Sequence, residues 1–208
     1  CNRARADMVF LLDGSGSIGR KFNRIKEFVF RVVSYFPRIG PDSTQMAVVK
    51  YSDSPQTEIP LTRFRDRNSL LQTLRAIPFL GGNTYTGCPG RAIQYALQSV
   101  LQPGGGTRAG VPRILVVITD GRSQDDLSGP AAYAVAQAGV QVFAVGTADA
   151  DRRQLELIAG RQPSTVPGRS RVFYLDTLEA FRSIEEDLVD TMCAVATVGP
   201  GPIDPPQV

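Results

Sequence analysis

Residues 7–12 read DMVFLL, and residues 13–17 read DGSGS. The first stretch is a nearly continuous apolar run of strand length, which is typical of a strand covered on both faces in a parallel sheet. It ends abruptly at Asp13, and apolar residues at helical spacing follow from Arg20 to Phe36, where proline and glycine close the segment. The sequence therefore predicts a strand that feeds a long helix across a short polar loop.

The same alternation of short apolar runs and helical patterns continues along the chain. Further strands are expected at Gln45–Tyr51, Pro55–Leu61, Arg113–Thr119, Val140–Gly146 and Arg171–Leu175, and further helices at Asp66–Ile77, Ala92–Leu101, Asp126–Ala138, Asp151–Ala159 and Thr177–Met192. Strands that alternate with helices imply right-handed crossovers. The expected fold is a doubly wound α/β domain with a mostly parallel sheet, one short antiparallel edge strand at 55–61, and helices on both faces.

Length and composition predict one domain with a short tail. The chain has 208 residues, 42% of them hydrophobic, which suffices for one core. We expect the domain to span residues 1–193 and residues 194–208, rich in proline and glycine, to form a linker. No apolar run reaches about 18 residues, so no membrane span is expected, and a secretion signal would lie outside this stretch.

The charge balance is mildly basic, with 23 Lys and Arg against 20 Asp and Glu and a net charge of +3. A net charge of this size is too small for a dedicated nucleic-acid-binding protein. Two basic groups could attract a glycosaminoglycan, which would suit a structural matrix module that binds partners through its surface; they are Arg20, Lys21, Arg24 and Lys26, with Arg63, Arg65 and Arg67. The alternative is that these side chains form an ordinary solvated face.

Acidic and hydroxyl side chains occupy the expected ligand-binding edge of the sheet. Asp13 and Asp120 each follow a buried strand, and ligands of open parallel sheets bind beyond the carboxyl ends of the strands. Hydroxyls lie beside them at Ser15, Ser17, Thr84 and Thr86. Such oxygen ligands suit Mg²⁺, Mn²⁺ or Ca²⁺, and a site with few carboxylates fits Mg²⁺ best. Taken singly, each residue could instead be a helix cap or a turn residue.

These motifs resemble a known family. Asp13, Ser15 and Ser17 reproduce a DxSxS motif, Thr84 lies in GGNTYTG, and Asp120 lies in ITDG; together they are similar to the metal-ion-dependent adhesion site of von Willebrand factor type A domains. The resemblance covers about residues 6–193 and is strongest to matrix members, the fibril-associated collagens and matrilins. It implies a secreted, non-enzymatic domain whose metal ion binds an acidic residue of a matrix protein or cell receptor.

One departure from the family pattern borders the expected site. Relatives usually continue from the second threonine and its glycine directly into a helix, whereas Cys88, Pro89 and Gly90 are expected here as an insertion before the helix. The insertion leaves Thr86 as an alternative ligand to Thr84.

The three cysteines are Cys1, Cys88 and Cys193. Cys1 precedes the first strand and Cys193 follows the last helix, so a disulfide between them would join the two ends of the domain in an oxidising compartment. The alternative is three unrelated thiols. Cys88 would then be unpaired or would link to another chain.

Enzymatic alternatives fit the sequence poorly. Gly14, Gly16 and Gly19 match a dinucleotide-binding fingerprint, but Asp13 would repel a pyrophosphate and no acidic residue ends a second strand about 20 residues later. A phosphate-binding loop fails because the required lysine and hydroxyl are displaced. A hydrolase could use a metal-bound water, but the chain has no histidine to act as a base.

Overall fold

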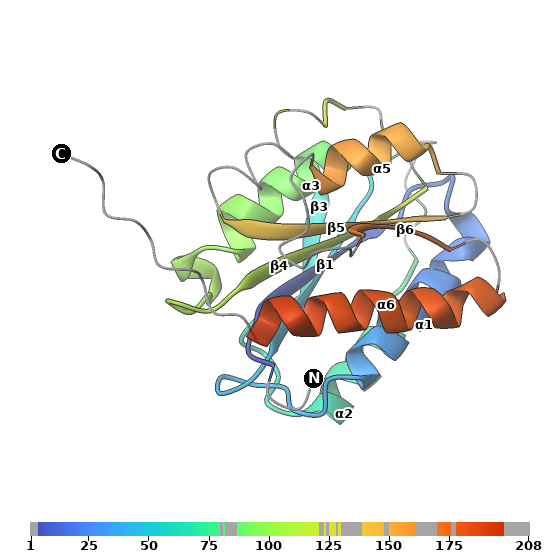
Figure 1. The fold of residues 1–208 in the computed structure, drawn as a ribbon. Helices are drawn as coiled ribbons and strands as arrows, with labels where there is room; N and C mark the ends of the chain where they lie inside the picture. The colour runs from blue at the N-terminus through green and yellow to red at the C-terminus, as the bar shows by residue number, and fades with distance from the viewer. Residues whose placement is uncertain are drawn as a thin grey trace.

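A six-stranded sheet forms the centre of the computed structural model (Figure 1). The structure describes residues 4–79, 81, 87–120, 123, 125–127, 129, 139–147, 150–160, 170–175 and 178–197, and for 175, 178–185 and 197 the backbone alone. The strands are β1 (Asp7–Asp13), β2 (Gln45–Tyr51), β3 (Pro55–Ile59), β4 (Arg113–Thr119), β5 (Val140–Thr147) and β6 (Val172–Leu175). Their order is β3-β2-β1-β4-β5-β6, and only β3 is antiparallel to its neighbour. The predicted fold is confirmed.

The described helices occupy the predicted segments with shifted ends. They are α1 (Phe22–Ser34), α2 (Arg67–Ala76), α3 (Pro89–Tyr95), α5 (Arg152–Ala159) and α6 (Leu178–Thr197). α1 is shorter than predicted because Gly19–Lys21 forms a separate 3₁₀ turn. α6 continues past the predicted end at Met192 to Thr197. Most of the helix predicted at 126–138 lies outside the described residues.

The start of α3 corrects one prediction. Pro89 and Gly90 are not an insertion before the helix; they form its first turn, and Cys88 is the residue before it. Proline is well suited to the first helical position because its missing N–H would have no partner there and its φ is already helical. The helix continues into a π-type turn at Ala96–Val100, where the Leu101 N–H donates to the Ala96 carbonyl over 2.6 Å.

The sheet is covered on both faces, which explains its continuous apolar strands. α1 and α6 lie below the sheet in Figure 1, and α3 and α5 lie above it. Alternate residues of β1 supply the two cores: Met8, Phe10 and Leu12 pack on the side of α1, and Val9 and Leu11 on the side of α3. This two-faced burial is the arrangement that favours uninterrupted Val, Ile and Leu runs.

Helices α1 and α2 are joined by side chains, each of which donates to carbonyls at the C-terminal end of the other helix. Arg67, the first residue of α2, donates from Nη1 to the carbonyl of Ser34 at the end of α1, over 3.1 Å. Lys26 of α1 donates from Nζ to the carbonyls of Arg75 and Ile77, at the end of α2, over 3.1 and 2.8 Å. Cationic side chains thus satisfy carbonyls that have no partner within their own helix.

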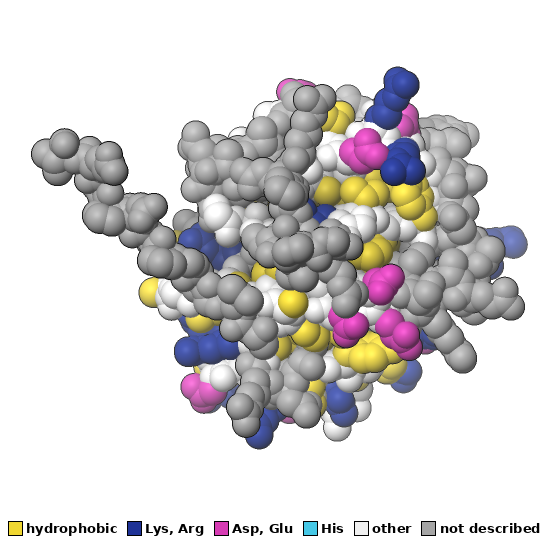
Figure 2. Space-filling view, viewed as in Figure 1, with side chains coloured by type: hydrophobic (Ala, Val, Ile, Leu, Met, Phe, Trp, Pro, Cys, Tyr) yellow, Lys and Arg dark blue, Asp and Glu magenta, His cyan; other side chains and the backbone are white. Residues whose placement is uncertain are grey.

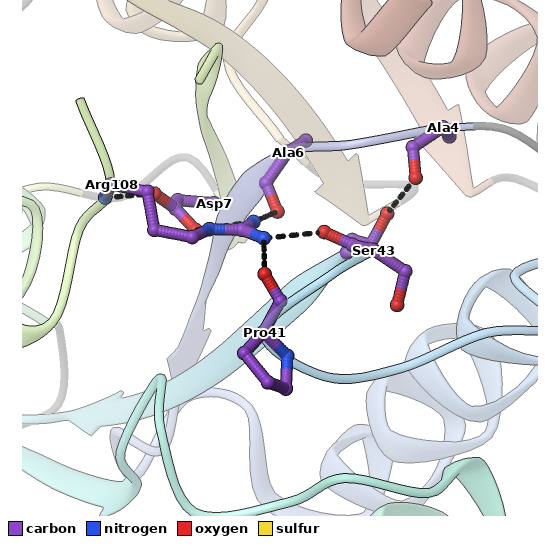
Figure 3. Close-up of polar contacts among 7 residues, drawn as sticks. Ala4, Ala6, Asp7, Pro41, Ser43 and Arg108 are labelled. Carbon is purple, nitrogen blue, oxygen red and sulfur yellow. Dashed lines mark hydrogen bonds and ion pairs between the residues drawn. The ribbon is translucent and has the colours of Figure 1, made fainter. Parts of the chain in front are cut away.

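A buried ion pair closes the amino-terminal edge of the sheet (Figure 3). Asp7 begins β1 and is fully buried, and Arg108 contacts it through Nη2 at 2.7 Å and Nε at 2.9 Å. The same guanidinium donates to the carbonyls of Ala6, Pro41 and Ser43 over 2.6 to 2.8 Å. One side chain therefore joins β1 to the loop before β2 and to the loop before β4.

The two ends of the domain lie together at this edge. The Arg5 N–H donates to the Ala196 carbonyl over 3.3 Å, and the Thr44 hydroxyl donates to the Ala4 carbonyl over 3.1 Å. Cys193 is disulfide-bonded and Cys88 is a free thiol, while Cys1, the predicted partner of Cys193, lies outside the described residues. Among the helices described, none has the length and apolar character needed to cross a membrane.

Candidate metal site

The candidate site lies where the strand order reverses. β1 pairs with β2 on one side and β4 on the other, and Leu12 is in register with Ile118. Asp13, the last residue of β1, and Asp120, the residue after β4, therefore emerge side by side at the carboxyl edge. This is the switch point at which open α/β sheets bind their ligands. The structure thus brings together two carboxylates that are 107 positions apart in the sequence.

Asp13 is fully buried and receives only neutral donors. Its Oδ1 accepts the Ser15 N–H over 2.9 Å, and its Oδ2 accepts the Thr119 hydroxyl over 3.2 Å. Among the described residues, no Lys or Arg contacts this carboxylate. A buried carboxylate without a positive partner is costly, so its surroundings favour a cation.

The pKa of Asp13 reflects the cost of burying its charge. Burial raises the pKa of Asp13 to about 6, against hydrogen bonds from Ser15 that lower it, and the nearby Asp120 carboxylate raises it further. Asp120 is itself buried. Two carboxylates close together at a site poor in water repel each other, and a divalent cation between them would relieve that repulsion.

The DGSGS loop folds so that its hydroxyls face each other. The Ser15 Oγ and Ser17 Oγ lie 3.1 Å apart, with Ser15 buried and Ser17 half-buried. The loop then turns at once into the first helix, because the Ile18 N–H donates to the Ser15 carbonyl over 3.2 Å. The remaining predicted ligand, Thr84, and its alternative, Thr86, lie outside the described residues.

Three further residues line the site and were not singled out from the sequence. Thr119 donates to Asp13, and the ring of Tyr51 lies fully buried beside it, with its hydroxyl 3.4 Å from the Ile118 carbonyl. A side chain at Gly87 would place its Cβ 3.0 Å from both the Asp13 Oδ1 and the Tyr51 Cε2. Glycine is therefore needed there for close approach. A glycine at the end of the threonine motif was a signal for this in the sequence.

Asp125 connects the β4 loop to the start of α3. Its Oδ1 accepts the Gly90 N–H over 3.1 Å and its Oδ2 accepts the Arg91 N–H over 2.7 Å. The Ser123 hydroxyl donates to the same carboxylate over 2.8 Å. Gly90 permits this contact, because a Cβ there would collide with the Asp126 carbonyl oxygen. The segment that follows Asp120 and the segment that contains Gly87 are therefore fixed together.

Cys88 lies beside this connection. Its N–H donates to the Ser52 carbonyl over 3.2 Å. Partial burial raises the pKa of the Cys88 thiol, and the Asp125 carboxylate adds to the effect. The thiol is thus protonated at neutral pH, which makes it a poor nucleophile.

The donors present fit a hard divalent cation. The described part of the site offers carboxylate and hydroxyl oxygens. Among the described residues, no three or more Asp, Glu or Cys side chains lie together as they would around a metal ion. Mg²⁺ is commonly held by one or two carboxylates with water in its remaining positions. Zinc more often takes nitrogen and sulfur ligands.

Comparisons with known proteins identify relatives along almost the whole chain. The family model for the von Willebrand factor type A domain matches residues 7–187. Collagen alpha-1(XII) of Notophthalmus viridescens is 36% identical over 99% of this chain and 21% of its own length. Collagen alpha-1(XX) of Homo sapiens is 41% identical over 74% of this chain and 12% of its own length. Matrilin-3 of Gallus gallus is 31% identical over 100% of this chain and 45% of its own length.

The chain spans less than half the length of these three relatives. They confirm the predicted matrix type and the predicted extracellular location, since they are matrix collagens and a matrilin. Proximal thread matrix protein 1 from the mussel byssus shares the fold, with a TM-score of 0.76 and 23% identity over 92% of this chain and 47% of that chain. Another structure of the mussel protein, with a TM-score of 0.76 and 22% identity over 92% of this chain and 46% of that chain, has a zinc-occupied MIDAS motif.

Proposed function

The chain belongs to the von Willebrand factor type A family, and from that premise we propose that it is a matrix adhesion domain that binds a protein partner through a divalent cation. The ligands proposed are Asp13, Ser15, Ser17, Thr84 and Asp120. The observation that carries the proposal is the burial of Asp13 without a positive partner among the described residues. A buried carboxylate of this kind is compensated when a cation occupies the site.

The proposed resident ion is Mg²⁺, with Mn²⁺ or Ca²⁺ as substitutes. An ion balanced by two carboxylates keeps no surplus negative charge, so it supplies a position at which an acidic side chain of the partner can coordinate. Asp13 and Asp120 set that charge balance, and Ser15 and Ser17 add neutral oxygens. The zinc-occupied MIDAS motif of the mussel protein supports a divalent-cation site in a domain of this fold.

The proposed partner is a matrix protein or a cell receptor that offers an Asp or Glu side chain. Binding, rather than catalysis, is the expected activity. The chain has no histidine, and Asp13 receives hydrogen bonds that hold its carboxylate in place rather than present it to a water or substrate. The matched collagens and matrilin are consistent with such a binding role.

A disulfide between Cys1 and Cys193 is also proposed. Cys193 is bonded, Cys88 is free, and the chain has three cysteines. The bond would fasten the segment before β1 to the end of α6, next to the contact between Arg5 and Ala196. We propose that Cys88 remains unpaired in the isolated domain.

The test is calorimetric titration of Mg²⁺ and Mn²⁺ into chelator-stripped domain, with the variants Asp13→Ala and Asp42→Ala. Asp42 is an exposed carboxylate in the loop before β2, at the opposite edge, so it serves as a matched control. We expect Asp13→Ala to lower the metal affinity at least about a hundredfold, and Asp42→Ala to leave it unchanged. Absence of heat and of thermal stabilisation in the parent would refute the metal site and leave a structural module.

A further inference from the structure

Positive charge is concentrated in one part of the domain. Residues 20–79 contain eleven Lys and Arg against five Asp and Glu, whereas residues 80–208 contain ten against thirteen. The small net charge of +3 therefore conceals two regions of opposite sign. Such asymmetry indicates a partner of opposite charge for one of them.

The fold gathers the basic residues at the junction of α1 and α2. We define the arginine surface by Arg31, Arg38, Arg63, Arg65, Arg67 and Arg75. Contacts place its parts side by side: Arg67 donates to the last residue of α1, the Arg75 guanidinium lies over the Phe30 ring of α1, and Arg65 lies against Gly40. In Figure 2, Lys and Arg side chains appear along the lower rim, where Figure 1 places α1 and α2.

Most of these guanidinium groups have no carboxylate partner. Arg38, Arg63, Arg65 and Arg75 are exposed and form no ion pair with any described residue. Of the nearby carboxylates, Glu27 pairs with Arg31 at 3.3 Å, and Asp66 accepts the Ser69 N–H at the start of α2. Asp42 is exposed in the loop of Gly40, so four exposed arginines face one further exposed carboxylate there. The surface therefore has an excess of uncompensated positive charge.

Two arginines are held in position by aromatic rings. The Arg75 guanidinium lies 4.0 Å from the centroid of the Phe30 ring, and that of Arg63 lies 5.3 Å from the centroid of the Phe64 ring. A guanidinium held over an aromatic ring keeps N–H groups for a second partner. Planar N–H pairs match the oxygens of sulfate and phosphate groups, so the geometry favours such anions.

The neighbouring helix limits where an anionic polymer could lie. The exposed side chains of α6 include Glu186, Asp187 and Asp190, and Figure 2 shows Asp and Glu side chains gathered over this helix. α6 packs beside α1 on the side away from α2 (Figure 1). Like charge would repel a polyanion from α6 and direct it along α2.

We propose that the arginine surface binds a sulfated glycosaminoglycan. Outside the cell, where the relatives of this chain act, sulfated polysaccharides are the polyanions that such a surface meets. The part of this surface at the Gly40 loop and the start of α2 lies near the amino-terminal edge, away from Asp13, so binding there needs no metal ion. It is therefore a second binding site, independent of the proposed adhesion site.

The test is the affinity of a heparin dodecasaccharide for the intact chain, measured by titration at several salt concentrations in the presence of a chelator. The triple variant Arg38→Gln/Arg65→Gln/Arg75→Gln is compared with Arg91→Gln/Arg152→Gln/Arg153→Gln, which removes the same charge from exposed arginines of α3 and α5. We expect the first variant to lose affinity about tenfold or more. The slope of log affinity against log salt concentration should become shallower by roughly two or three. The second should change affinity by less than about twofold.

Further arms separate the possible outcomes. Both variants should keep the circular dichroism spectrum of the parent, because the altered side chains are exposed. The Asp13→Ala variant should bind heparin as the parent does, even if it binds no metal. Equal losses in the two triple variants would overturn the proposal, as would equal affinity for a hyaluronan oligosaccharide of the same length, which has carboxylates but no sulfates.

Discussion

Two aspartates lie fully buried at opposite ends of β1, and they are stabilised in different ways. Asp7 at the amino-terminal end is paired with Arg108, whose remaining donors bond to three carbonyls. Asp13 at the carboxyl-terminal end accepts hydrogen bonds from Ser15 and Thr119 and contacts no described cation. The first carboxylate is neutralised by the fold itself. The second leaves a charge that an external ion can neutralise.

The comparison distinguishes a structural ion pair from a binding site in physical terms. Both carboxylates lose their hydration on folding, and both need compensation. A compensating group supplied by the chain adds to folding stability, whereas one supplied from solution adds to binding affinity. One end of β1 therefore has a carboxylate whose compensation contributes to folding stability, and the other end has a carboxylate whose compensation would contribute to binding.

The largest expected effect is the loss of the chain's own compensation. Replacement Arg108→Ala leaves Asp7 buried without its cation, and we expect it to lower the free energy of unfolding by about 3 to 5 kcal/mol. Urea denaturation of the variant and of Arg91→Ala, which removes an exposed arginine, measures the difference. Metal affinity should be unchanged in whatever fraction remains folded. If Arg108→Ala were as stable as Arg91→Ala, the amino-terminal ion pair would not contribute to stability.

The next effect concerns the pH dependence of the metal-free domain. The pKa of Asp13 is about 6 in the folded chain, above its ordinary value of 3.8, so the folded state binds this proton more tightly than the unfolded state. Stability from this group is present below pH 3.8 and is lost as pH rises through 6, a change of about 3 kcal/mol.

An Asp13→Asn variant isolates that change. Its asparagine is neutral at all pH values, so the variant should gain stability over the metal-free parent as pH rises from 4 to 7. Denaturation of both proteins across this range, with chelator present, measures the difference. A difference that did not vary with pH would contradict the assignment of an uncompensated charge to Asp13. The same proton should compete with Mg²⁺ in the parent at acidic pH.

The smallest effect tests the connection between the two loops of the site. Asp125→Asn weakens the bonds to Gly90 and Arg91, which should loosen Gly87 against Asp13 and lower Mg²⁺ affinity about tenfold. Asp66→Asn is the control, since Asp66 accepts a backbone N–H in the same way at the start of α2. Calorimetry and thermal unfolding of both variants separate the effects. Equal losses of metal affinity would mean that Asp125 acts on helix stability alone.

The sequence predicted the fold because its local signals agree with one another. Continuous apolar runs such as residues 113–119 predicted strands buried on both faces, and the structure confirms this for β4. Element ends were predicted less well, because they depend on distant partners. α3 begins at Pro89 rather than Ala92, where its first turn is bound by Asp125, 35 residues after Gly90.

The candidate site was predicted in part. Asp13, Ser15, Ser17 and Asp120 follow apolar strands, and parallel strands end at a common edge, so the structure brings them to the same region. Thr84 stays a prediction. The contributions of Tyr51 and Thr119 were missed because a tyrosine and a threonine inside strands look like ordinary core residues until the neighbouring strand is known.

By itself, the sequence determined the order of strands and helices along the chain and the edge of the sheet at which Asp13, Ser15, Ser17 and Asp120 gather. Periodicity and strand ends are local properties, so they can be seen without coordinates. Only the tertiary structure decided which buried aspartate is neutralised. Arg108 reaches Asp7 across 101 positions of sequence, and no arginine or lysine among the described residues reaches Asp13. Charge compensation depends on distance in space, and distance in space is what folding sets.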